Sequence, residues 1–256
     1  MVDEITQLSE VIEKIIRKKS GSPSVLREVV EQLNFLESVV ETSEPFNEKY
    51  SLLTYIREAK KHILTLKDQA EGRIKEIEDL RERWWRTLAA INNIAKNGLG
   101  ELEDVKSQTI QGQRTMPIEL KKILDDLART QKDLINLSNE MLQGMKTGER
   151  FEKMVQLWWT QKYFDQIDDV IKKFVQRIGE FEIMLPRAAE KKVEAFGRGG
   201  TRELEKTYGE MYIFERLDKL LNVYKQIKDF FEHSEIGSLN AIKTLTHKTI
   251  QTFKLR

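Results

Sequence analysis

The sequence predicts an all-α protein, an elongated antiparallel helical bundle with long coiled-coil-like helices. Apolar residues recur at steps of three and four through most of the chain, which is the period of one helix face. Only 4 prolines and 13 glycines interrupt its 256 residues. No stretch alternates apolar and β-branched residues with polar ones in the pattern of a strand. We therefore interpret residues 1–256 as a single elongated helical domain.

The longest predicted helix extends from Lys49 to Asn97. It contains no proline and a single glycine, Gly72. At 1.5 Å per residue such a helix would reach roughly 70 Å, so the other helices are expected to align along it. Gly98 and Gly100 predict its end. Residues 98–116 then combine glycines with a polar tract, which predicts a mobile loop.

Residues 1–42 are predicted to form a helical hairpin that packs on the long helices. Its first helix carries an apolar face over residues 3–19. Ser22 is expected to cap the second helix, and Pro23 occupies a first helical position, where no amide donor is needed.

Four further helices are predicted after the loop, over residues 117–147, 149–185, 201–233 and 238–256. Pro186 lies inside an apolar pattern and predicts a kink or break in the fourth long element. Residues 197–200 predict a loop, after which Thr201 is expected to cap the next helix. Ser238 is expected to cap the last one.

The composition excludes several kinds of chemistry. The chain has no cysteine, so disulfides, thiolate catalysis and cysteine-ligated metal sites are excluded. His62, His233 and His247 match no metal-binding motif, and no phosphate-binding glycine motif occurs. No catalytic constellation is evident, so the prediction is a non-enzyme without cofactor, metal or small-molecule substrate.

The N-terminus lacks the pattern of a secretory signal, and no apolar run is long enough to cross a membrane. The 43 basic and 42 acidic residues nearly cancel, so no global charge favours nucleic acid or anionic lipid. We expect a soluble, cytoplasmic protein.

Two tryptophan pairs, one of them flanked by arginine, are the candidate partner-binding residues. One member of each pair is expected to face the core while the other lies at its flank. If successive helices alternate in direction, the two pairs lie within about two helical turns of each other. Tryptophan and arginine are typical of protein hot spots and of base-stacking surfaces. The candidates are Arg83, Trp84, Trp85, Arg86, Trp158 and Trp159.

Residues 236–256 carry positive charge without any acidic residue. Lys243, Lys248, Lys254 and Arg256 are therefore candidates for binding an anionic surface, with an apolar side formed by residues such as Ile242. The segment is also interpretable as the last helix of the bundle, with its lysines in water. The second interpretation is the preferred one.

These features predict a non-enzymatic scaffold or assembly protein that acts through protein–protein interaction. Its partner would be another protein or a second copy of the chain in a homo-oligomer. Two alternatives remain open: a membrane-associated BAR-like helical module, and a helical protein that binds nucleic acid. Both alternatives predict binding that weakens with salt.

Overall fold

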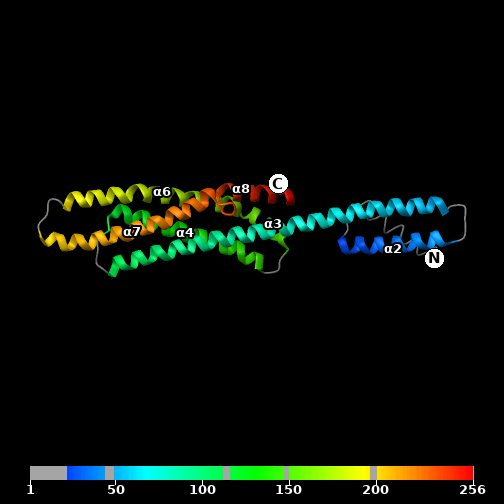
Figure 1. Ribbon diagram of the computed structural model, residues 1–256, viewed down its shortest axis with the longest axis horizontal. Coiled ribbons are helices and arrows are strands. Elements are labelled where there is room, and N and C mark those ends of the chain that lie inside the picture. The colour runs from blue at the N-terminus through cyan, green and yellow to red at the C-terminus, as the bar shows by residue number, and fades with distance from the viewer. Residues whose placement is uncertain (1–21, 44–48, 112–115, 147–149, 197–200, 256) are drawn as a thin grey trace. The chain divides into compact units, whose positions relative to one another are not determined.

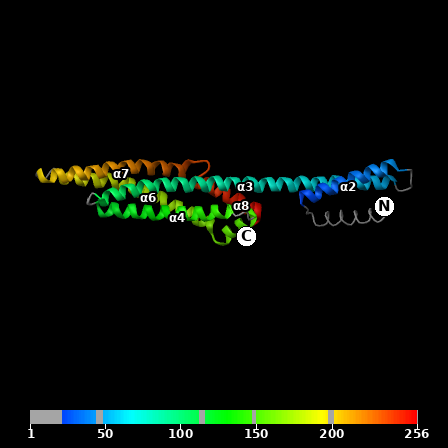
Figure 2. The same cartoon turned by 90° about the horizontal axis from the view of Figure 1, so that it is seen from below.

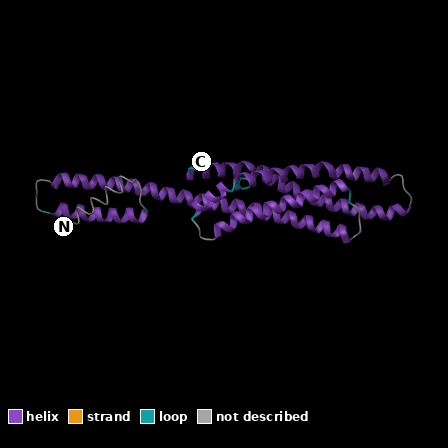
Figure 3. Ribbon diagram, turned by 180° about the vertical axis from the view of Figure 1, so that it is seen from behind, coloured by secondary structure: helices purple, strands orange, loops and turns teal. Residues whose placement is uncertain are grey.

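A computed structural model describes residues 22–43, 49–111, 116–146, 150–196 and 201–255. These ranges contain seven α-helices and no strand (Figure 3). The predicted all-α class is therefore confirmed. The first helix of the predicted N-terminal hairpin and the predicted loop at residues 197–200 lie outside the described residues.

Contacts divide the chain into two compact units, residues 1–79 and 80–256. The long helix α3 contributes residues to both units. The helices are α2 (Pro23–Thr42), α3 (Lys49–Gln111), α4 (Ile118–Lys146), α5 (Phe151–Thr160), α6 (Tyr163–Phe196), α7 (Thr201–His233) and α8 (Leu239–Phe253).

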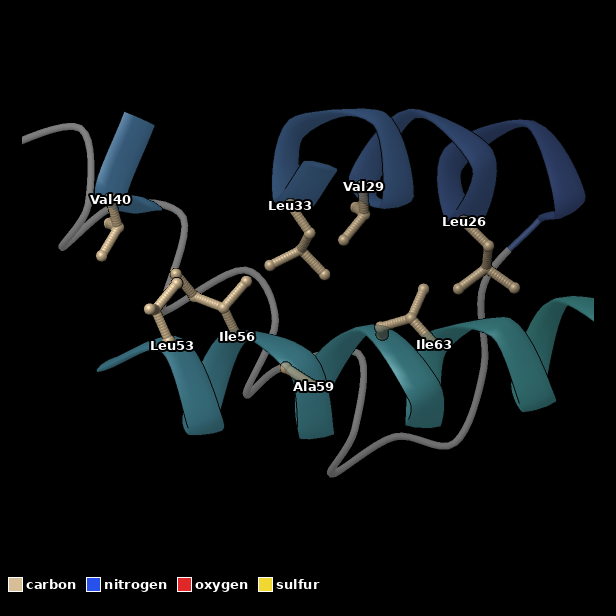
Figure 4. Close-up of a cluster of buried hydrophobic side chains, with 8 residues drawn as sticks. All are labelled: Leu26, Val29, Leu33, Val40, Leu53, Ile56, Ala59 and Ile63. Carbon is tan, nitrogen blue, oxygen red and sulfur yellow. The ribbon is translucent and has the colours of Figure 1, made fainter. Parts of the chain in front are cut away.

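In the first unit, α2 packs against the beginning of α3 through a cluster of aliphatic side chains (Figure 4). Leu33 and Ile63 are buried at its centre. The predicted cap of α2 is confirmed, since the Ser22 hydroxyl accepts a hydrogen bond from the backbone amide of Val25. On one flank Glu37 pairs with Arg57, and the hydrogen bonds to Glu37 lower its pKa.

The predicted end of α3 at the glycines is wrong. The helix continues through Gly98 and Gly100 as far as Gln111, so most of the predicted mobile loop is helical. At Gly98 the missing side chain has a structural reason. A Cβ atom there would lie 2.6 Å from Nε2 of Gln131 on α4 and 2.6 Å from Cδ1 of Ile227 on α7. Gly98 thus allows α4 and α7 to approach α3 closely.

The second unit is a bundle built from the later part of α3 together with α4, α6 and α7. Helix α6 contacts both α4 and α7, and α6 and α7 lie side by side in two views (Figures 1 and 2). Helix α8 contacts α5, α6 and α7. Its predicted cap is confirmed, because the Ser238 hydroxyl accepts from the amide of Ala241.

Buried hydrogen bonds connect α3 to its neighbours inside the bundle. Asn92 Nδ2 donates to the Ser138 hydroxyl of α4 at 2.8 Å. The Tyr224 hydroxyl of α7 donates to Oε1 of Gln131 at 2.9 Å, and both side chains are fully buried. Burial raises the pKa of Tyr224 well above its ordinary value. Such bonds require specific partners, so they favour one alignment of the helices.

The sequence predicted a kink or a break at Pro186, and the structure shows no break there. Helix α6 passes through Pro186 without interruption, with that proline exposed on its outer face. The break lies at Gln161 and Lys162, between α5 and α6. Lys162 adopts a left-handed backbone with φ 57°, which interrupts the right-handed helix there.

Candidate functional site

An aromatic cluster forms the core where α3, α5, α6 and α8 meet. The rings of Trp84 and Trp158 lie 5.7 Å apart in an edge-to-face arrangement, so the two tryptophan pairs do come together. Phe164 of α6 lies 5.4 Å from Trp84, and Phe151 lies 5.7 Å from Phe253 of α8. Aromatic pairs in such geometries contribute more to stability than the burial of their surface alone.

The first tryptophan of each pair belongs to the core. Trp84 is fully buried, and its indole nitrogen donates a hydrogen bond to the hydroxyl of Thr249 on α8 at 2.9 Å. Trp158 is 2% exposed. These two residues therefore stabilise the fold. Because they are buried, a partner could not contact them directly.

The second tryptophan of each pair is accessible, as expected for neighbours about 100° apart on a helix. Trp85 is 38% exposed and Trp159 is 37% exposed. Of the predicted arginines, Arg86 forms an ion pair with Glu82 one turn earlier, and Arg83 is exposed. Of the six predicted residues, Trp159 lines a groove.

This groove, which we call the α5–α8 groove, is a half-open depression of about 650 Å³. One wall is a single face of α5, and the other is the end of α8. Phe164 and Phe253 line it and belong to the aromatic cluster beneath, so its base is made of packed rings. The lining residues are Glu152, Gln156, Trp159, Thr160, Lys162, Phe164, Asp165, Phe253, Lys254 and Leu255.

Two lysines at the rim of the groove have an unusual backbone. Lys162 follows α5 with φ 57°, and Lys254 ends α8 with φ 51°. They are the only residues other than glycine with positive φ in the described part of the chain. Glycine or asparagine normally occupies such positions, because a larger side chain costs about 1 kcal/mol or more there. Local backbone preference thus does not account for lysine at either position.

The predicted anion-binding residues have different surroundings in the structure. Lys254 lines the groove, but Nζ of Lys243 lies 4.0 Å from Oδ1 of Asp168 on α6. Lys248 is half-buried, and Arg256 lies outside the described residues. The apolar side of α8 is used within the bundle, where Ile242 is 1% exposed. Helix α8 is therefore packed as the closing helix.

Most groove residues were not singled out from the sequence, because the break between α5 and α6 was not anticipated. One feature of the sequence does mark the break between α5 and α6. The apolar stripe that passes through Met154 and Trp158 is interrupted until Phe164 and Ile167, and Gln161 and Lys162 occupy the turn where the next apolar residue would stand. Such an interruption indicates a change of helix direction even without glycine or proline.

Within the ranges that the structure describes, no group of three or more His, Asp or Glu side chains could hold a metal ion. No described helix combines the length and apolar character needed to cross a bilayer. No family model, curated protein or solved structure matches the chain.

Proposed function

We propose that this protein is a non-enzymatic helical scaffold or assembly protein that binds a protein partner in the α5–α8 groove. The observation that carries the proposal is the groove itself, an accessible concave surface on a packed aromatic base. The groove has a volume of about 650 Å³ and is lined by both aromatic and charged side chains.

The wall formed by Trp159 suits a protein partner. Tryptophan is among the residues that contribute most to protein interfaces, and Trp159 still has more than a third of its surface available for burial. Next to it on α5, Trp158 is buried in the aromatic cluster. A surface that is already ordered loses little conformational entropy on binding, which favours affinity.

The two alternatives have less support. A BAR-like module would need an apolar or basic face for the bilayer, but the apolar side of α8 is buried in the bundle. A nucleic-acid-binding protein would use Trp85 with its neighbouring arginines, and Arg86 is paired with Glu82. We also propose that the helices form an elongated, antiparallel, coiled-coil-like bundle and that the protein is cytoplasmic. The partner is either another protein or a second copy of the chain.

Photo-cross-linking in cells tests the proposal. A photoreactive amino acid replaces Gln156 inside the groove, and in a control chain it replaces Lys173, which is exposed on α6 away from the groove. We expect a discrete protein adduct from position 156 that is weaker when Trp159→Ala is also present. An adduct at twice the chain mass identifies a second copy as the partner. Equal adducts from both positions, or none from position 156, contradict the proposal.

A further inference from the structure

Four charged residues line the α5–α8 groove, and within the described residues no ion pair joins any of them to another group. Glu152 lies at one end of α5, and Lys254 follows the end of α8. Lys162 and Asp165 lie at the other end, on either side of the start of α6. The lining of the groove therefore carries two cations and two carboxylates.

This arrangement discriminates between classes of partner. A uniformly anionic partner, such as a nucleic acid or an anionic membrane, would pair with the lysines but would bring like charge against Glu152 and Asp165. Like charges brought together at an interface lower affinity and suppress the wrong partners. A segment that carries both signs of charge can pair with all four groups.

We propose that the α5–α8 groove binds a mixed-charge segment of a protein partner. An apolar or aromatic anchor of that segment would pack on Phe253 beside Trp159, with acidic and basic residues flanking it. This inference rests on the proposed function and adds the chemistry of the partner. It assigns Lys162, Lys254, Glu152 and Asp165 as recognition residues.

The backbone of the two lysines makes their role separable from stability. Asparagine accepts a left-handed backbone more readily than lysine does, so Lys162→Asn and Lys254→Asn should leave the fold as stable or more stable. A loss of binding in these variants then reflects the missing charge and not unfolding. Glu152→Gln and Asp165→Asn remove the carboxylates with little change of shape.

The probe is a peptide selected from a phage-displayed random dodecapeptide library on the full chain, with counter-selection on the Trp159→Ala variant. Its affinity is measured by fluorescence anisotropy against three double variants. They are Lys162→Asn with Lys254→Asn, Glu152→Gln with Asp165→Asn, and a control with Asp169→Asn and Lys173→Gln, two exposed α6 residues outside the groove.

We expect the selected peptides to contain both acidic and basic residues around an apolar one. Both groove variants should weaken binding about threefold to tenfold, as the loss of two exposed charge pairs implies, while the control binds like the parent.

Tighter binding after removal of the carboxylates would overturn the inference in favour of a polyanion. Phosphatidylserine vesicles and polyuridine RNA would then identify the source. Peptides that depend on Trp159 but on none of the four charges would also overturn it and leave the protein-binding function standing. Failure to select any Trp159-dependent peptide, together with no cross-link from position 156, would remove the proposed function itself.

Discussion

Substitution of Gly98 by alanine measures how closely the helices approach inside the bundle. In an unconstrained helix this change stabilises by about 0.8–1.0 kcal/mol, because alanine loses less backbone entropy than glycine. In the fold, the new Cβ would lie 2.6 Å from both Gln131 Nε2 and Ile227 Cδ1. Gln131 cannot simply swing away, because it is buried and bonded to Tyr224. Forcing an extra methyl group into such a core costs about 1–3 kcal/mol.

Gly100 provides a matched control two residues later on the same helix. A Cβ at Gly100 meets nothing within 4 Å, so Gly100→Ala should gain the helix propensity alone. The propensity term cancels between the two variants. The difference in their free energies of unfolding should therefore equal the overpacking cost, about 1–3 kcal/mol, with Gly98→Ala the less stable.

Urea denaturation followed by tryptophan fluorescence suits this comparison, because all four tryptophans lie in the unit of residues 80–256. Addition of Ile227→Val removes the Cδ1 atom and should recover part of the loss in the Gly98→Ala background. Equal stability of the Gly98→Ala and Gly100→Ala variants would refute the close approach of α3 to α4 and α7, and with it the reason given for the glycine.

Three further predictions concern the interior of the second unit. Because the folded protein raises the pKa of Tyr224, the fold favours the neutral phenol, and this stabilisation is fully present below pH 10. Above pH 10 the free energy of unfolding should fall by about 1.4 kcal/mol per pH unit. Tyr224→Phe should reduce this slope in urea titrations. Trp84→Ala should destabilise by ~3–5 kcal/mol through a cavity and the loss of the hydrogen bond to Thr249, whereas a loss under ~1 kcal/mol would place Trp84 outside the core. Deletion of residues 236–256 removes buried side chains worth ~1.5–3 kcal/mol each, so the thermal melt should shift clearly downward, and a parent-like melt would contradict the packing of α8.

Features that depend on local sequence were predictable. The helical class follows from apolar spacing that repeats over every two turns, and the structure confirms it. The caps at Ser22 and Ser238 follow from a hydroxyl that reaches an amide three residues later, a contact made within one turn. The division of each tryptophan pair into a buried and an accessible residue follows from the 100° step of the helix.

Features that depend on distant residues were not predictable in the same way. Gly98 resembles a helix end in sequence, because glycine is common at such ends. Only the neighbouring α4 and α7 show that it is a contact point inside a continuous helix. Pro186 resembles a break because a proline inside a helix removes one backbone hydrogen bond and its ring crowds the carbonyl four residues earlier. In the structure it lies on the exposed face of a helix that continues through it.

The sequence by itself thus determined that the chain is helical, where several helices begin, and that cysteine chemistry is excluded. The tertiary structure decided where α3 ends, where α5 gives way to α6, and which side chains form the α5–α8 groove. The physical reason is the range of the interactions. Helix formation and capping act over a few residues, whereas the groove exists only because packing of the aromatic cluster brings the end of α8 against α5.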